Sequence, residues 1–494
     1  MSLNYEGGKT WPYPTRSVEL VEGWKKEDFE KRLVLNEVER SVLGELENGL
    51  YESLNGIKKM KVEKDKTDYE EVASRRFELE KHYWESHGDL TNYSEPERKR
   101  KNVDDESLLK KVSEYRKFKG RIKDLLRETN SGEETDLVVA ASIILEIYKR
   151  YVNVKIAEDI ILDGWSPRKT ERVDKFVNGV FPEFDENGDF VVLGKVLEDR
   201  VEEIEKNNVS DYEFPNVWVD EDDAEILADY LFKKLNFSEW KVVRRKTDKT
   251  SMAINTKDKK INIGKEMRIR VEDFLPVLAH EIEGHAANAE FGGKALKIMD
   301  RYSAGGRSSI MTEMLGKWVE QKTRQKMDLQ PKEPETLYFR ILEMKKKGAT
   351  FYECFDYYFR KYAEKKGYDV KSVFGNLQEY TEIFDYTYDR VMRIFRRRGS
   401  LSDRYSHLTI SSQLKYLEQS LVLEKVVELG IEKIMFKDGM DLFAVKDLFA
   451  LGIFDDIHEE RCSFVVAKGI WPVIKKGLND GKGIKDILAE MKMG

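Results

Sequence analysis

The chain has 494 residues, of which 36% are charged, and its formal net charge is −7. This length is too great for one ordinary hydrophobic core and predicts two or three packed units. The mildly acidic balance argues against a protein whose main role is to bind nucleic acid. With only two cysteines, Cys354 and Cys462, no disulfide framework is expected, which suits a reducing compartment.

Residues 1–210 are rich in Glu, Lys, Arg and Leu, and their apolar residues recur at helical spacing. We therefore expect a helical N-terminal region, to which the sequence assigns no role. Two basic runs, residues 58–66 and 97–101, are interleaved with or followed by acidic residues. They predict solvated helix faces or loops and no nucleic-acid partner.

Two further features bear on the compartment. The longest apolar stretch, residues 137–148, is interrupted by Ser142 and Glu146 and is too short to span a bilayer. Residues 1–17 lack the basic region and apolar run of a secretory signal. We expect a soluble, cytoplasmic protein with no membrane partner, and the sequence does not indicate its oligomeric state.

The pattern changes in residues 211–330. Residues 219–237 begin with acids and end with lysines, which predicts a helix. Residues 239–247 and 259–266 alternate apolar and polar side chains, as short strands do. The segment 271–293 predicts a helix that begins close to Pro276, since proline is tolerated in a first turn, and that ends at Gly292.

From Ser309 to the C-terminus the pattern is helical again, with one or two short helices expected within residues 438–454. The aromatic run at 352–362 has helical spacing and predicts a buried face. The fold class expected is α+β and predominantly helical, with a small β-sheet. The regions expected are 1–210, a core at 211–330 and a helical C-terminal subdomain at 331–494.

The motif "HEIEGH" places His280 and His285 five positions apart at the start of the predicted helix. In a regular helix these positions lie about 140° apart and diverge, whereas the usual four-residue spacing gives about 40°. The two histidines can share a metal only if the helix is locally widened, as in a π-bulge. Gly284 is where such a distortion meets least resistance.

Spacing alone does not define a metal site, because "HYWESH" also puts His82 and His87 five apart and reads as ordinary surface residues. Glu281, directly after the first histidine of "HEIEGH", makes the difference. In HExxH-type sites this glutamate accepts a proton from the metal-bound water and later passes it to the leaving amine. The alternative is a pair of core histidines.

Catalytic zinc usually has three protein ligands and a water molecule. No further histidine is near, so a carboxylate on the following helix is the natural third ligand. Glu313, in "MTEMLGKW", is the candidate, and Glu320, on the same helical face, competes with it.

Residues 217–454, with "HEIEGH" and "TEMLG", resemble the HExxxH zincins that include the microtubule-associated tyrosine carboxypeptidase and bacterial proteins named for a QEGLA motif. The resemblance implies a zincin-like metallopeptidase domain. It implies Zn²⁺ held by His280, His285 and Glu313, with Glu281 as catalytic base. "TEMLG" keeps the Glu and Leu of the family motif, while Met314 replaces Gly and Gly316 replaces Ala.

The resulting functional hypothesis is a zinc-dependent carboxypeptidase that cleaves near a peptide or protein C-terminus. Arg393 or Arg396 would bind the substrate carboxylate through bidentate hydrogen bonds. Tyr416, in "ISSQLKYL", would donate to the oxyanion. Asn288, one turn after His285, would support the site; a helix-end cap is its alternative role.

Two alternatives are open. "HEIEGH" also resembles the "HELLGH" of dipeptidyl peptidase III, which predicts release of dipeptides from the N-terminus. The departures in "TEMLG" and "ISSQLKYL" suggest a third possibility, a binding or regulatory protein that keeps the fold without turnover.

Overall fold

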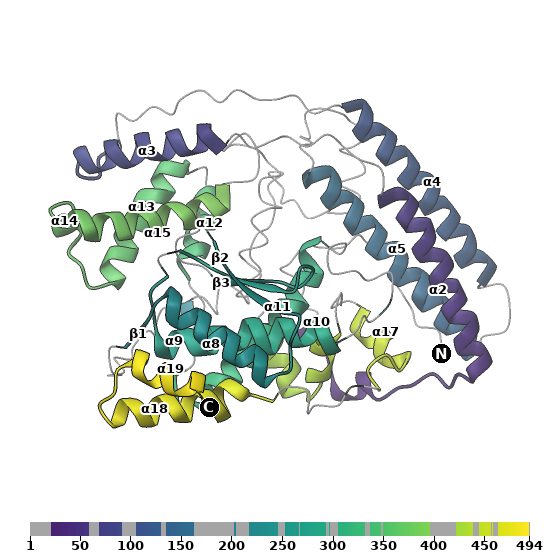
Figure 1. Cartoon of the computed structure of the whole chain (residues 1–494). Coiled ribbons are helices and arrows are strands. Elements are labelled where there is room, and N and C mark those ends of the chain that lie inside the picture. Colours follow the sequence, from purple (N-terminus) through teal and green to yellow (C-terminus); the bar gives the residue numbers. More distant parts are fainter. Residues whose placement is uncertain are drawn as a thin grey trace. The chain divides into compact units, whose positions relative to one another are not determined.

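A computed structural model of the chain describes residues 21–58, 69–90, 105–129, 135–162, 202–203, 217–245, 252–265, 267–292, 296, 305–330, 336–346, 349–395, 421–437, 444–455, 457 and 463–493 (Figure 1). Most of these residues are helical, and the strands are short, which confirms a predominantly helical α+β chain. None of the described helices combines the length and the apolar character that crossing a membrane requires. Of the two basic runs, only Lys58 is described.

The chain forms two compact units, each assembled from separate stretches of sequence. Unit 1 comprises Met1–Gly23, Leu35–Asn207 and Pro334–Glu418. Unit 2 comprises Trp24–Val34, Asn208–Glu333 and Gln419–Gly494. The expected core at 211–330 lies in unit 2, whereas the expected C-terminal subdomain is divided between the two units.

In unit 1, three long helices pack together: α2 (Glu37–Lys58), α4 (Asp105–Thr129) and α5 (Asp136–Leu162). The apolar stretch at 137–148 lies within α5, where Ala140, Ile144 and Leu145 are almost fully buried. The hydroxyl of Tyr148 donates to the carbonyl of Leu50 and so ties α5 to α2. This apolar stretch is thus a packed helix of a helical unit.

The aromatic run predicted to be buried also lies in unit 1. It forms α13 (Phe351–Lys365), which lies beside α15 (Leu377–Phe395), as Figure 1 shows. Tyr83 of α3 (Tyr69–Glu85) is fully buried against Phe355 and Phe359, and its hydroxyl donates to Asp356 at 2.7 Å. The remaining described helices of this unit are α12 (Leu337–Lys346) and α14 (Val370–Val373).

Unit 2 contains the predicted helix and strands. The helix is α8 (Glu221–Lys234), capped by the Asp220 carboxylate, which accepts from two backbone amides of the first turn. The predicted strands are β2 (Lys241–Arg244) and β4 (Lys260–Ile263), which pair in parallel. Strand β3 (Met252–Asn255), which the sequence pattern does not indicate, pairs antiparallel to β4 and completes the order β2-β4-β3. Two shorter strands, β1 (Trp218–Val219) and β5 (Ile269–Arg270), pair separately.

The histidine-bearing helix is continuous and has three parts: α9 (Val271–Ala279), a π-helical segment η2 (His280–Ala286) and α10 (Ala287–Phe291). Its end at Gly292 confirms the prediction, but its start does not: the helix begins at Val271, with Pro276 inside it. Proline leaves the carbonyl four residues earlier without its helical donor. That carbonyl, of Glu272, accepts from the Arg324 guanidinium at 3.5 Å, so another helix compensates for the proline.

Of the other helices of unit 2, α8, α11 (Gly305–Lys326) and a second π-helical segment, η6 (Val466–Ile470), contact the histidine-bearing helix. Further helices of this unit include η1 (Lys26–Phe29), η3 (Glu432–Phe436), α17 (Val445–Ala450), α18 (Trp471–Asn479) and α19 (Ile484–Met493). Phe29 of η1 packs edge-on against Phe449 of α17, with 5.1 Å between ring centroids. A short N-terminal stretch therefore belongs to the core of unit 2.

Candidate metal centre

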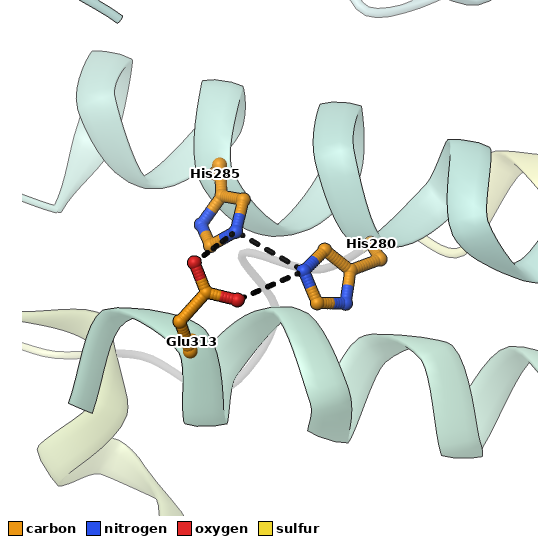
Figure 2. A group of neighbouring side chains, drawn as sticks. All are labelled: His280, His285 and Glu313. Carbon is orange, nitrogen blue, oxygen red and sulfur yellow. Dashed lines mark hydrogen bonds and ion pairs between the residues drawn. The ribbon is translucent and has the colours of Figure 1, made fainter. Parts of the chain in front are cut away.

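The two motif histidines converge because the helix is widened between them. The π-helical turn occupies His280–Ala286, and the two Nε2 atoms lie 3.1 Å apart (Figure 2). This confirms the local widening that the five-residue spacing requires. The other pair with this spacing behaves differently, since His87 is exposed and lies beyond the end of α3 with φ of 53°.

Glu313 on α11 completes the group. Its Oε2 lies 3.6 Å from His280 Nε2 and its Oε1 lies 3.6 Å from His285 Nε2 (Figure 2). A tetrahedral zinc ion with ligands at 2.0–2.1 Å places neighbouring ligand atoms roughly 3.3 Å apart. The three separations, 3.1, 3.6 and 3.6 Å, fit the edges of such a site.

The surroundings of the three groups differ. The His280 and His285 side chains are 9% and 4% exposed, whereas that of Glu313 is 30% exposed. Glu313 is therefore the least buried of the three groups.

Charge at the centre favours a cation. Burial alone would lower the pKa of His280, but Glu313, Glu320 and Glu281 outweigh it and raise that pKa to about 9. For Glu313, burial alone would raise the pKa, because it disfavours the charged carboxylate. The hydrogen bond to His280 and the charge of His285 outweigh burial and lower the pKa of Glu313 to about 2. The group therefore attracts positive charge, whether a proton or a metal ion.

The competition between Glu313 and Glu320 is settled by which ring nitrogen each carboxylate meets. Glu320, two turns after Glu313 on α11, lies 3.3 Å from Nδ1 of His280, on the side of the ring away from His285. It is not part of the group whose ligand atoms converge, which is His280, His285 and Glu313. Glu320 thus contacts His280 from the other side of its ring and does not face the point on which the three candidate ligand atoms converge.

Two glycines let the ligand helices approach. A Cβ at Gly316 of α11 would lie 2.5 Å from His280 Nε2, and a Cβ at Gly284 would lie 3.0 Å from the Cα of Gly316. Gly284 was expected to ease the widened turn, and the structure adds this packing role. The requirement at Gly316 was missed, although a glycine inside a helix is a signal, since it costs up to about 1 kcal/mol relative to alanine.

Glu281, the predicted base, is half-buried beside His280. Its Oε2 accepts from the backbone amide of Ile254 at 3.0 Å. Ile254 lies in β3, an edge strand of the described three-stranded sheet. Strand β3, which the sequence pattern does not indicate, thus holds the carboxylate of Glu281 in place.

Glu283, the second glutamate of "HEIEGH", was not considered as a functional residue. It is 2% exposed, and its two oxygen atoms accept from the backbone amides of Val465 and Val466 at 2.8 and 3.0 Å. Burial raises the pKa of Glu283, opposed by these hydrogen bonds. This carboxylate caps the helix that contains η6 and joins it to the histidine-bearing helix.

Of the four residues expected to bind substrate or support the site, the structure describes the side chain of Asn288 alone. Asn288 is 6% exposed and lies against Gly292, in a small cavity that Leu315 and Phe436 also line. Arg393 is on α15, but its side chain lies outside the described part of the chain, as do Arg396 and Tyr416 entirely.

Comparison with known proteins adds no relative: the chain matches no protein-family model, and no curated protein or solved structure is significantly similar to it. Within the described ranges, His280, His285 and Glu313 form the group with the spacing for a metal ion.

Proposed function

We propose that this chain is a zinc-dependent peptidase. The observation that carries the proposal is the convergence of His280, His285 and Glu313, with Glu281 directly beside the first histidine. Two imidazoles and one carboxylate form a donor set typical of catalytic zinc. The resemblance to the HExxxH zincins supports the same assignment.

When bound, zinc supplies a water molecule of lowered pKa and polarises the carbonyl of the substrate. The chain supplies the proton transfers. Glu281 keeps one oxygen on the Ile254 amide, which fixes the orientation of its carboxylate. That carboxylate accepts a proton from the attacking water and returns it to the leaving amine.

The narrower assignment, a carboxypeptidase acting near a peptide or protein C-terminus, is supported by the family resemblance alone. It requires a cation that binds the free carboxylate. Arg393 and Arg396, the candidates from the sequence, belong to unit 1, whereas the candidate metal centre lies in unit 2. A peptide with an amidated C-terminus should then be a poor substrate, and acetylation of its N-terminus should have little effect. The reverse result would favour the dipeptidyl-peptidase alternative.

The test begins with elemental analysis of the purified full chain, beside the double variant H280A/H285A. We expect about one zinc ion per chain, absent from the variant. Peptide hydrolysis is then compared between wild type and E281Q. We expect E281Q to keep its zinc and to lose activity by at least about 10²-fold, since general acid–base catalysis contributes about 10²–10⁴. Undiminished hydrolysis by zinc-loaded E281Q would refute the mechanism, and zinc binding without any hydrolysis would favour a binding or regulatory protein.

A further inference from the structure

Glu320 and Lys317 form a pair directly behind the candidate metal centre. The Glu320 side chain is 5% exposed, and its Oε2 lies 3.3 Å from His280 Nδ1 and 2.6 Å from Lys317 Nζ. Lys317 is on the same helix, one turn before Glu320, and its side chain is 34% exposed. A single carboxylate oxygen thus meets a ligand histidine and a lysine that reaches solvent.

The contact with Nδ1 has a chemical consequence for the other ring nitrogen. A neutral imidazole carries its proton on one nitrogen and is an acceptor at the other. Glu320 Oε2 and His280 Nδ1 lie 3.3 Å apart without the alignment of a hydrogen bond, so the contact is electrostatic. A carboxylate at this position favours keeping a proton on Nδ1, so the proton that leaves when the ring becomes neutral is the one on Nε2, which faces His285 and Glu313. Nε2 is the atom a metal ion needs.

Lys317 explains how a carboxylate is tolerated at this depth. A buried carboxylate without a partner is costly, and its charge is retained where cations and hydrogen-bond donors surround it. Lys317 places its ammonium group on the oxygen that faces His280. The pair therefore keeps an anionic acceptor on the imidazole while the lysine stem spans from the interior to the surface.

We propose that Glu320 is a positioning residue of the metal centre: it holds His280 with its proton on Nδ1, and Lys317 stabilises Glu320 in that role. Glu320 is not a ligand. The inference rests on the proposed metal site but not on peptidase activity, because its effect is on metal affinity and on the histidine tautomer.

The experiment measures zinc affinity of the full chain by competition with a chromophoric chelator near neutral pH. Wild type is compared with E320A, with the nearly isosteric E320Q and with E272Q. Glu272 is a matched control, because it is also buried, at 8% exposure, on the same histidine-bearing helix, but belongs to none of the contacts around His280. We expect zinc affinity to fall by about 10–100-fold in E320A. E320Q should lie between E320A and wild type, and E272Q should bind like wild type.

A second readout separates orientation from general destabilisation. In the zinc-loaded protein, ¹⁵N NMR of the imidazoles should show His280 protonated at Nδ1 in wild type, with this signal broadened by solvent exchange in E320A. Equal zinc affinity in wild type and E320Q, with an unchanged His280 signal, would overturn the proposal even if E320A does not fold. If the wild-type chain binds no zinc, both the metal site and this inference are wrong. If the Glu320 variants bind zinc more weakly than wild type but wild type hydrolyses no peptide, the inference stands and the peptidase assignment is wrong.

Discussion

At the residue scale, the protonation of His280 determines how zinc affinity and the stability of the metal-free chain should depend on pH. Its pKa in the metal-free chain is raised to about 9 from an ordinary value near 6.5, the net result of burial and neighbouring carboxylates. Its protonation therefore stabilises the metal-free fold fully below about pH 6.5 and ceases to do so as the pH rises through about 9. A metal ion and this proton compete for the same nitrogen.

We therefore expect zinc affinity to rise with pH between about 6.5 and 9, by up to about tenfold per pH unit. Chelator competition across this range measures it. In the same range the metal-free chain should lose stability in urea unfolding while the zinc-loaded chain does not. A flat affinity profile, once the titration of the chelator is subtracted, would show that the proton is not held at His280.

Gly316 gives a second prediction at this scale. A Cβ there would lie 2.5 Å from Nε2 of His280, so G316A must displace the ring or the helix. We expect zinc affinity to fall at least about tenfold, with a stability loss of about 1–3 kcal/mol. The matched control is G120A on α4, where nothing lies within 4 Å of the added Cβ. That variant should be neutral or stabilised by up to about 1 kcal/mol, since alanine favours helix. Equal zinc binding in both variants would contradict the packing argument.

At the scale of elements, local sequence patterns predict the helix ends and strands that depend on nearby residues. The acids at the start of α8, the alternation predicted around β2 and β4 and the glycine after α10 all mark elements where the structure has them. The five-residue histidine spacing predicts a widened turn, because geometry leaves no other way to converge. The preference for Glu313 over Glu320 came from the family resemblance and not from spacing, since both share one helical face and only the helix–helix packing decides which ring nitrogen each meets.

The start of the histidine-bearing helix shows a different limit. Proline inside a helix is penalised through the carbonyl it leaves unpaired. Here that carbonyl, of Glu272, is met by Arg324 from α11. A compensation between residues on separate helices leaves no trace in local spacing, so the expectation that the helix begins close to Pro276 was wrong.

The capping of η6 by Glu283 gives a prediction for the C-terminal helices. E283A leaves the amides of Val465 and Val466 without their acceptor in a buried position. We expect a loss of about 1–3 kcal/mol in unfolding free energy. Hydrogen exchange at residues 464–470 should accelerate more than exchange in α8. Uniform acceleration over both segments would indicate general destabilisation and not a lost cap.

At the scale of the whole molecule, the order of segments along the chain differs from their grouping in space. Unit 2, which holds the candidate metal centre, includes Trp24–Val34 from near the N-terminus. Phe29, 4% exposed, packs there against Phe449, and the Leu33 amide donates to the Ala450 carbonyl at 2.9 Å. A fragment beginning at residue 211 would therefore lack part of the core of the metal-binding unit.

We accordingly expect F29A to destabilise unit 2 by about 3–5 kcal/mol, the usual loss for a buried phenylalanine. Thermal unfolding with and without zinc identifies the transition that zinc raises, and F29A should lower that same transition. F77A serves as the control, because Phe77 is 63% exposed on α3 and should change stability by less than about 0.5 kcal/mol. A shift confined to the zinc-independent transition would show that residues 24–34 do not stabilise unit 2.

The glycine contact between the ligand helices has a consequence for ion selectivity. At Gly284 and Gly316 the two helices meet through main-chain atoms, so no change of rotamer can alter their separation. A ligand set held at one spacing by backbone contact discriminates by ionic radius. Ions that prefer oxygen ligands at about 2.3–2.6 Å, such as Ca²⁺, would require the helices to move apart, whereas an ion with bonds near 2.0–2.1 Å would not. We therefore expect the absence of two side chains to restrict the size of the ion that the candidate site accepts.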